Sequence, residues 1–292
     1  MARVRGAAGP NVVALGGGHG LSTSLRAARR YAGQVTAVVS VADDGGSSGR
    51  LRTAFGIPAP GDLRKCLVAL ADADSVWTRA FEHRFEAGEL EGHAFGNLVI
   101  AGLADSSGDF EVALAEAGRL VGSVGRVFPA TREPVVLKAE VEGESVEGQV
   151  AVANAGRIGG VSLIPADPEP PDGALEALAA ADQVVIGPGS LFTSVLAVVA
   201  VPAIRDALAA TRARKVYVCN LRPQDPETKG YDVAGHVAAL GAHGLAVDTV
   251  LCHRGALPEG DLRVESVEAD VGLPDLSAHD PARLAEVLAT LV

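Results

Sequence analysis

The sequence predicts an α/β protein with a Rossmann-like parallel sheet, helices on both faces and a small antiparallel β excursion. The apolar run Val12–Leu15 ends in glycines, a helical pattern follows at residues 21–32, and a second β-branched run occupies residues 35–41. This spacing is typical of the βαβ unit of parallel sheets. Aromatic residues make up only 4% of the 292 residues, so the core must consist mainly of Val, Ala and Leu, as in buried parallel strands.

The remaining elements of the first half are helical patterns followed by a β-rich stretch. The helical patterns lie at about residues 62–71, 75–86, 96–104 and 110–120. From Gly125 to Leu163 the chain becomes rich in Val with period two, and Glu142-Gly143-Glu144-Ser145 reads as a hairpin turn. We therefore expect an antiparallel excursion at about residues 125–164, inserted in a single domain that spans residues 1–292.

Short buried strands with loops at their carboxyl ends return in the second half. Val184–Ile186 leads into Gly187-Pro188-Gly189-Ser190, Lys215–Cys219 into Asn220, and residues 247–252 into His253. Open α/β sheets bind ligands at the edge formed by the carboxyl ends of their strands. The last element is an amphipathic helix at residues 281–291, for which Asp280 is the expected N-cap.

Composition and charge restrict the possible partners. A net charge of −11 disfavours nucleic acid as a general partner, and no apolar run reaches the ~18–20 residues that span a bilayer. No signal-peptide stretch follows Met1–Arg5. Three widely spaced cysteines, Cys66, Cys219 and Cys252, indicate free thiols. We expect a cytoplasmic protein with neither membrane nor nucleic acid as a partner.

The first candidate ligand site is the glycine-rich turn between the first strand and the first helix. Backbone N–H groups in such a turn approach an anion at a helix N-terminus. The dinucleotide fingerprint fails because Leu21 stands at its last glycine, and no Lys-Ser/Thr follows for a Walker motif. A tight turn without a ligand is the alternative, and His19 could equally cap the helix. The candidate ligand-binding residues are Gly16, Gly17, Gly18, His19, Gly20 and Ser22.

The second candidate is the acidic pair that follows the second strand, together with the basic stretch behind it. Asp43 and Asp44 could bind a hard metal such as Mg²⁺ or a ribose, and they are the only candidates for a catalytic role. An Asp-rich turn that caps a helix is the alternative. Residues 45–65 hold four basic side chains and one acidic, which favours an anion site. Arg50 and Arg64 are the preferred phosphate ligands, because guanidinium binds phosphate in a bidentate fork. Further candidates in this stretch are Ser47, Ser48, Asp62 (an N-cap with equal odds) and Lys65.

Candidates of a third kind lie at later helix starts and strand ends. His93 and Asn97 flank a helix start, where either could contact a base or sugar or cap the helix. A second strand–glycine–helix anion site contains Gly187, Pro188, Gly189, Ser190 and Thr193, and Asn220 opens a polar loop that extends to Thr228. The two glycine loops suggest a ligand that lies across a cleft between two halves of one sheet. No zinc spacing, no G-x-S-x-G elbow and no nucleophile is found.

At these residues the sequence resembles the gluconeogenesis-factor (YvcK) family of the CofD-like superfamily. The stretches that carry the resemblance are Ala14–Ser22, Ser40–Arg52, Gly61–Asp72, Gly92–Ile100, Ile186–Ser194 and Tyr217–Thr228. The resemblance implies a Rossmann-like, CofD-like domain that binds a nucleotide sugar of the UDP-N-acetylglucosamine type. It also implies a homodimer and a regulator of gluconeogenic growth and of cell shape. His19 and residues 222–226 depart from the family pattern, and the segment around His279 and Asp280 resembles it only weakly.

Three functions remain open. The leading hypothesis is a nucleotide-sugar sensor without turnover. The alternative is a Mg²⁺-dependent 2-phospho-L-lactate transferase-type enzyme, which the other branch of the superfamily represents and which would place its metal-binding acid at Asp43 or Asp44. That enzyme would act on a nucleoside-diphosphate-linked donor. A nicotinamide-dependent oxidoreductase is disfavoured because the fingerprint is broken.

Overall fold

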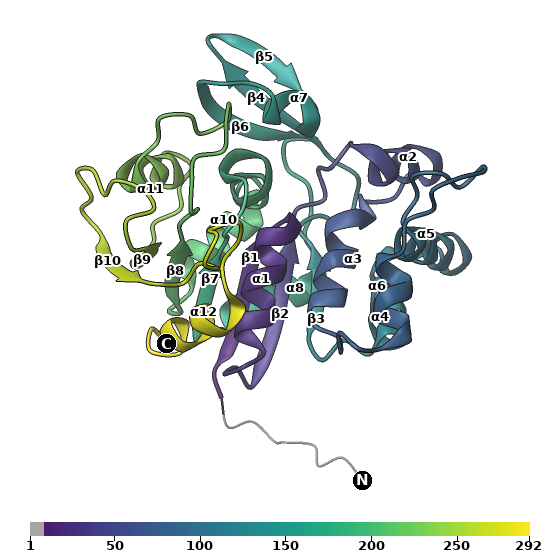
Figure 1. Cartoon of the computed structure of the whole chain (residues 1–292). Coiled ribbons are helices and arrows are strands. Elements are labelled where there is room, and N and C mark those ends of the chain that lie inside the picture. The colour runs from purple at the N-terminus through teal and green to yellow at the C-terminus, as the bar shows by residue number, and fades with distance from the viewer. Residues whose placement is uncertain (1–8) are drawn as a thin grey trace.

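The computed structural model describes residues 9–292, so the expectation for Met1–Arg5 lies outside the described residues. Its main feature is a seven-stranded sheet in the order β10-β9-β8-β7-β1-β2-β3, in which every pairing is parallel (Figure 1). The strands are β1 (Asn11–Gly16), β2 (Gln34–Val39), β3 (Arg126–Pro129), β7 (Gln183–Ile186), β8 (Arg214–Val218), β9 (Thr249–His253) and β10 (Glu265–Ala269).

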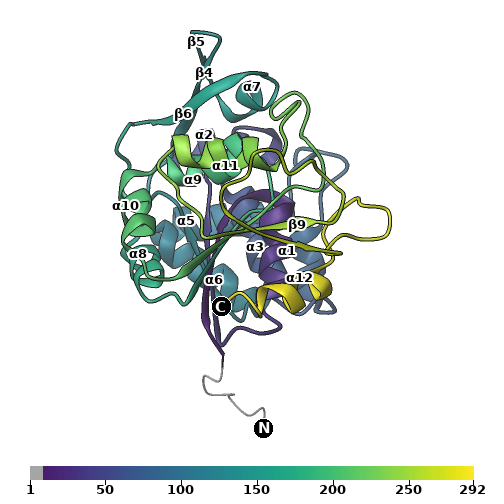
Figure 2. The same ribbon diagram turned by 90° about the vertical axis from the view of Figure 1, so that its left-hand side faces the viewer.

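Helices cover both faces of this sheet, which confirms the predicted fold class. Helices α1, α3 and α12 lie on one face, and α8, α9 and α10 lie on the other (Figures 1 and 2). The helices are α1 (Gly18–Ala28), α2 (Gly46–Phe55), α3 (Pro60–Ala69), α4 (Val76–Glu82), α5 (Phe95–Ser107), α6 (Phe110–Val121), α8 (Asp172–Ala179), the π-helix η1 (Leu191–Val195), α9 (Leu196–Val199), α10 (Pro202–Ala210), α11 (Val233–Ala242) and α12 (Pro281–Leu288). Asp280 caps α12 as expected, with Oδ1 accepting from Ala282 N at 2.8 Å.

The strand order reverses direction between β1 and β7. From β1 the chain builds outward through β2 to β3, and then it returns to the other side of β1 and builds outward again from β7 to β10. Leu15 of β1 pairs with Ile186 of β7, so the two strands end side by side. Loops that leave such a point diverge to opposite faces, and the crevice between them is the usual ligand position in open α/β sheets.

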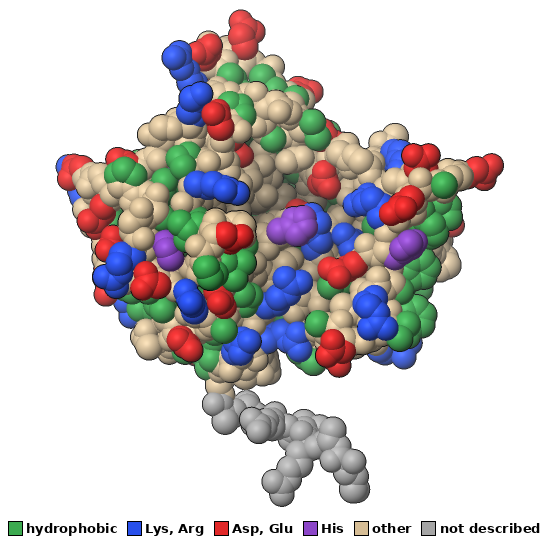
Figure 3. Space-filling view, viewed as in Figure 1, with side chains coloured by type: hydrophobic (Ala, Val, Ile, Leu, Met, Phe, Trp, Pro, Cys, Tyr) green, Lys and Arg blue, Asp and Glu red, His purple; other side chains and the backbone are tan. Residues whose placement is uncertain are grey.

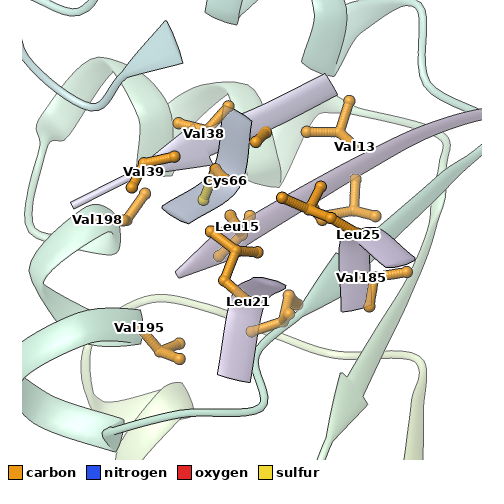
Figure 4. Close-up of a cluster of buried hydrophobic side chains, with 14 of the residues drawn as sticks. Val13, Leu15, Leu21, Leu25, Val38, Val39, Cys66, Val185, Val195 and Val198 are labelled. Atoms are coloured by element: carbon orange, nitrogen blue, oxygen red, sulfur yellow. The ribbon is translucent and has the colours of Figure 1, made fainter. Parts of the chain in front are cut away.

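The core is aliphatic and holds β1 and α1 firmly against the rest of the sheet (Figure 4). Both faces of β1 are covered, so its side chains form a continuous apolar run in place of an alternating pattern. Leu15, Leu21 and Leu25 are fully buried. The three cysteines are free and buried, and Cys66 lies in this cluster. The turn at residues 16–18 therefore joins two rigid elements.

The antiparallel excursion is a three-stranded sheet with one short helix. It contains β4 (Val136–Val141), β5 (Glu144–Glu147), α7 (Gln149–Ala153) and β6 (Ile158–Ile164). Val141 pairs with Glu144, and the turn residues Glu142 and Gly143 have φ values of 52° and 89°, as in a type I′ hairpin. The predicted hairpin is confirmed.

One predicted boundary is wrong, and one helix was not predicted. Residues 126–129 form β3, the edge strand of the parallel sheet, and the antiparallel part begins at Val136. The pattern of four residues cannot tell a parallel edge strand from an antiparallel one. The glycine- and serine-rich stretch after Asp44, which is absent from the predicted helical patterns, forms α2 and begins after Gly45. Gly49 permits this turn because a Cβ there would lie 2.0 Å from the carbonyl oxygen of Asp44.

Among residues 9–292, no single helix has the length and apolar character needed to cross a bilayer, although the bent pair Leu191–Val199 and Pro202–Ala210 passes that test on length and composition.

Candidate functional site

A cavity of about 220 Å³ lies beside the switch point between β1 and β7. Four segments surround it: the first turn of α1, the loop after β7, the loop after β8, and residues 276–279 before α12. Its lining includes His19, Gly20, Pro188, Gly189 and Asn220, which are all predicted site residues. The structure thus brings the two predicted glycine loops together at one cavity. On the face drawn in Figure 3, acidic and basic side chains are interspersed.

The first glycine loop is glycine-rich partly for structural reasons. Gly16 and Gly18 have φ values of 145° and 64°, which side-chain-bearing residues rarely adopt. Gly20 faces the second loop, and a Cβ on it would lie 2.1 Å from the carbonyl oxygen of Pro188. Ser22 turns back into its own helix, where its Oγ donates to Gly18 O at 3.1 Å. The loop is therefore shaped by its contact with residues 187–189 as well as by any ligand.

A carboxylate of the protein lies at the N-terminus of α1. Asp62 Oδ2 accepts from Gly18 N at 2.6 Å, and Asp62 Oδ1 accepts from Lys65 Nζ at 3.0 Å. The alternative that Asp62 caps its own helix is wrong, because α3 begins at Pro60 and Ala59 is its N-cap. Within residues 9–292, the N–H groups of His19 and Gly20 have no hydrogen-bond partner. These two donors remain open at a helix N-terminus beside the cavity.

A second carboxylate of the protein occupies the N-terminus of η1. Glu227 is buried, and its Oε1 accepts from Phe192 N at 2.7 Å, from Thr193 N at 3.1 Å and from Ser190 Oγ at 2.6 Å. Ser190 Oγ also bonds Thr193 Oγ1. The predicted second anion position is thus filled from within the chain. Glu227 is not among the predicted site residues, because nothing local in residues 219–228 indicates that this loop folds back onto η1.

Asn220 ties the loop after β8 to the second glycine loop. Its Oδ1 accepts from Gly189 N at 3.1 Å, and its Nδ2 donates to Gly189 O at 2.9 Å. This paired contact fixes the peptide of Gly189 at the cavity wall. Any ligand contact by Asn220 stays a prediction.

The two carboxylates that follow β2 accept hydrogen bonds from different parts of the chain. Asp43 Oδ1 accepts from Gly45 N at 3.0 Å, and Asp44 Oδ1 accepts from Val150 N of the excursion, also at 3.0 Å. Burial raises the pKa of Asp43; the Gly45 hydrogen bond opposes the rise, and the nearby Asp62 adds to it. No group of three or more His, Cys, Asp or Glu side chains suited to a metal ion is found among residues 9–292. Mg²⁺ binding at Asp43 and Asp44 stays a prediction.

The predicted polar residues of α2, α3 and α5 form an internal network. Arg64 is only 6% exposed, and its Nε donates to Asn97 Oδ1 at 3.1 Å while its Nη1 donates to Phe81 O at 3.0 Å. Asn97 Nδ2 donates to Ser47 Oγ at 3.1 Å, and His93 Nδ1 lies 3.1 Å from the same oxygen. Neither His93 nor Asn97 caps α5, because its N-cap is Ala94. These side chains hold the three helices together.

The remaining predicted residues differ in their accessibility. Ser48 packs against Gly61, where a Cβ would lie 2.1 Å from its Oγ. Arg50 lies at a separate open groove beside Arg84, and its Nη2 donates to Glu91 O at 2.9 Å. Lys65 lowers the pKa of His19, with burial as the second cause, so the imidazole is neutral at physiological pH. Arg222 lines the cavity, and the charge of Lys65 acts on the cavity-lining His19.

The fold and the position of the cavity define a class: a Rossmann-like α/β protein with a cavity at the topological switch point of its sheet, where open α/β sheets usually bind ligands. The family model described as 2-phospho-L-lactate transferase CofD matches residues 12–286. A gluconeogenesis factor from Halalkalibacterium halodurans is 45% identical over 248 residues, which cover 83% of this chain and 77% of that protein. The Bacillus subtilis gluconeogenesis factor is 41% identical over 265 residues, which cover 89% and 84%.

A solved structure agrees with these sequence matches. The crystal structure of a UPF0052-family protein from Bacillus halodurans is similar with a TM-score of 0.90 and 38% identity, covering 96% of this chain and 98% of that chain. This chain belongs to the gluconeogenesis factor family and carries a CofD-like domain. It matches only about half of a longer relative from Nostoc, with 45% identity over 55% of that protein.

Proposed function

We propose that this protein binds a nucleotide sugar of the UDP-N-acetylglucosamine type at the switch point between β1 and β7. The observation that carries the proposal is that the two glycine loops meet beside one cavity, with the N–H groups of His19 and Gly20 open to it. A diphosphate at the N-terminus of α1 would accept from these amides and gain from the helix dipole. Lys65 and Arg222 would supply positive charge.

The proposed role is that of a cytoplasmic, homodimeric regulator of gluconeogenic growth and of cell shape, with no membrane or nucleic-acid partner. The name of the relatives supports the link to carbon metabolism. We propose binding without turnover, because three polar side chains at this edge already bond the protein's own backbone: Asp62 accepts from Gly18 N, Glu227 from Phe192 N, and Asn220 from Gly189 N.

A Mg²⁺-dependent transferase that acts on a nucleoside-diphosphate-linked donor is the second candidate. The description of the matching family model and the half-buried carboxyl of Asp43, with its raised pKa, favour it. A carboxyl of this kind would serve as a proton acceptor near neutral pH. This candidate predicts that Asp43→Asn abolishes product formation from a guanylated or uridylated lactate donor with Mg²⁺ while the fold stays intact.

Isothermal titration calorimetry with UDP-N-acetylglucosamine tests the leading proposal. We expect saturable heat that UDP reproduces in part, because the diphosphate contacts are shared. The absence of heat at millimolar ligand would contradict the proposal. Product formation during the same titration would favour the transferase.

A further inference from the structure

A second cavity lies at the free edge of the seven-stranded sheet, two strands away from β1. The outermost strand there is β3, and its residues 126–129 form one wall of a cavity of about 400 Å³ (Figure 1). Five residues of α6 form the opposite wall: Glu111, Leu114, Ala115, Gly118 and Arg119. Positions at this spacing share one face of a helix. The cavity is therefore a groove between an edge strand and one helix face.

The backbone of Val127 offers an open donor and an open acceptor to this edge groove. Directly after β3, Ala130 N donates to Val39 O of β2 at 2.7 Å. Backbone groups alternate in direction along a strand, so those of Phe128 also face β2, and the N–H and C=O of Val127 point away from it. Among residues 9–292 these two groups form no hydrogen bond outside the ladder. The edge can therefore pair with one further strand.

The floor of the edge groove is apolar. Leu67 of α3, Leu114 of α6 and the side chain of Val127 are buried there, and Pro129 completes the strand side. The volume of about 400 Å³ falls within the ~300–1,000 Å³ of ligand pockets. The groove thus has room for an apolar side chain of a bound segment.

One cation at the edge groove has no acidic partner. The other two charged residues of its walls are paired, because Arg119 Nη2 donates to Glu116 Oε2 at 2.6 Å and Arg132 Nε donates to Glu111 Oε1 at 2.9 Å. Arg126 is exposed and forms no ion pair among residues 9–292. The groove therefore presents one uncompensated positive charge, which complements a carboxylate.

The charge and the apolar floor belong to opposite faces of β3. The guanidinium of Arg126 lies 5.6 Å from the ring centre of Phe128, and that ring packs on Gly173 of α8, where a Cβ would lie 2.6 Å from it. Val127 points to the other face, where Leu67 and the groove lie. A strand added to β3 alternates in the same way. Its residue for the groove and its residue for Arg126 are therefore neighbours in sequence.

We propose that the edge groove binds an extended peptide of a partner protein, which adds to β3 as a further strand. One apolar side chain of the peptide enters the groove, and the carboxylate of an adjacent Asp or Glu pairs with Arg126. In strand addition, backbone bonds supply affinity and the side-chain pockets supply specificity. The site lies apart from the switch-point cavity and does not depend on nucleotide binding.

Selection from a phage-displayed library of random octapeptides tests the proposal. Wild type should enrich peptides in which an apolar residue adjoins Asp or Glu. Arg126→Glu should instead enrich Lys or Arg at that place. It should also weaken the best synthetic wild-type peptide by roughly tenfold in calorimetry, because an attractive charge pair becomes a repulsive one. Arg30→Glu is the matched control, an equally exposed arginine beyond the end of α1 that should select and bind as wild type does.

The backbone part of the proposal has its own test. Val127→Pro removes the outward N–H and leaves the bonds to β2, because proline is tolerated where the N–H of an edge strand faces outward. It should weaken the peptide by roughly tenfold while the circular dichroism spectrum stays unchanged. Hydrogen exchange of the Val127 amide in wild type needs no variant. It should slow when the peptide is bound, and an unchanged rate would overturn strand addition.

The remaining outcomes are distinct. The absence of enriched peptides, or enriched peptides whose affinity is the same for wild type and Arg126→Glu, would overturn the proposal. A wild-type dimer that Arg126→Glu dissociates in analytical ultracentrifugation would make the edge groove an interface between two copies of this chain, which also overturns it. Arg126→Glu should bind UDP-N-acetylglucosamine as wild type does, so the nucleotide proposal is tested separately.

Discussion

Gly20 and Pro188 bring the two glycine loops into contact: a Cβ on residue 20 would lie 2.1 Å from the carbonyl oxygen of Pro188. The two residues are far apart in the sequence, but they follow neighbouring strands that end side by side. Because the other atoms involved belong to backbone, the contact cannot relax by the movement of a side chain. The shape of the cavity at the switch point depends on this approach.

Gly20→Ala should therefore both destabilise the protein and weaken nucleotide binding. We expect a loss of about 1–3 kcal/mol in the free energy of unfolding, the usual range for overpacking. Gly102→Ala is the control, because it lies within α5 and a Cβ there meets nothing within 4 Å. It should be neutral or stabilising by up to ~1 kcal/mol. Urea unfolding of both variants measures these changes. Equal changes in the free energy of unfolding for the two variants would contradict the close contact between Gly20 and Pro188.

Glu227→Gln should loosen the loop after β8. The carboxylate accepts from two backbone amides and from Ser190 Oγ, and an amide side chain replaces one of its two acceptor oxygens with a donor. The expected loss is about 2 kcal/mol in the free energy of unfolding. Hydrogen exchange of the Phe192 and Thr193 amides should become faster. The exposed Glu86→Gln is the control and should leave both quantities unchanged.

Asp62→Asn distinguishes direct phosphate binding from binding through a metal. If the diphosphate lies directly on the N-terminus of α1, removal of the neighbouring negative charge should strengthen nucleotide binding by a few-fold. If Mg²⁺ bridges the ligand to the acidic residues, the same change should weaken binding. Calorimetry in EDTA and in Mg²⁺ separates the two. If Asp62→Asn binds the nucleotide more weakly than wild type in Mg²⁺ but not in EDTA, the result would support the transferase.

Stability should fall as the pH drops below about 6.5, the ordinary pKa of histidine. Burial lowers the folded-state pKa of His279 to about 4, so between these values the unfolded chain binds a proton that the folded chain does not. For this group the loss between pH 7.5 and pH 5 is about 2 kcal/mol. His279→Asn should reduce the pH-dependent loss by that amount in urea unfolding. An unchanged pH dependence would show that the ring titrates normally.

Local patterns predict the parallel sheet and its edge well. Apolar runs that end in glycine or asparagine mark the ends of β1, β7 and β8, because a strand buried on both faces must be apolar until it leaves the sheet. Which side chains lie at the carboxyl ends of these strands depends on contacts between residues that are far apart in the sequence. No local pattern predicts such contacts. Asp62 reaches Gly18, and Glu227 reaches Phe192. Arg64, preferred in the sequence as a phosphate ligand, instead bonds Phe81 and Asn97, because α3 packs against α4 and α5.

A crystal structure with UDP-N-acetylglucosamine bound would show directly whether the ligand lies at the switch point between β1 and β7. We expect the diphosphate within hydrogen-bond distance of the N–H groups of His19 and Gly20, with one ring of the ligand in the cavity lined by Pro188 and His279. A nucleotide bound elsewhere, for example in the open groove of Arg50 and Arg84, would contradict it.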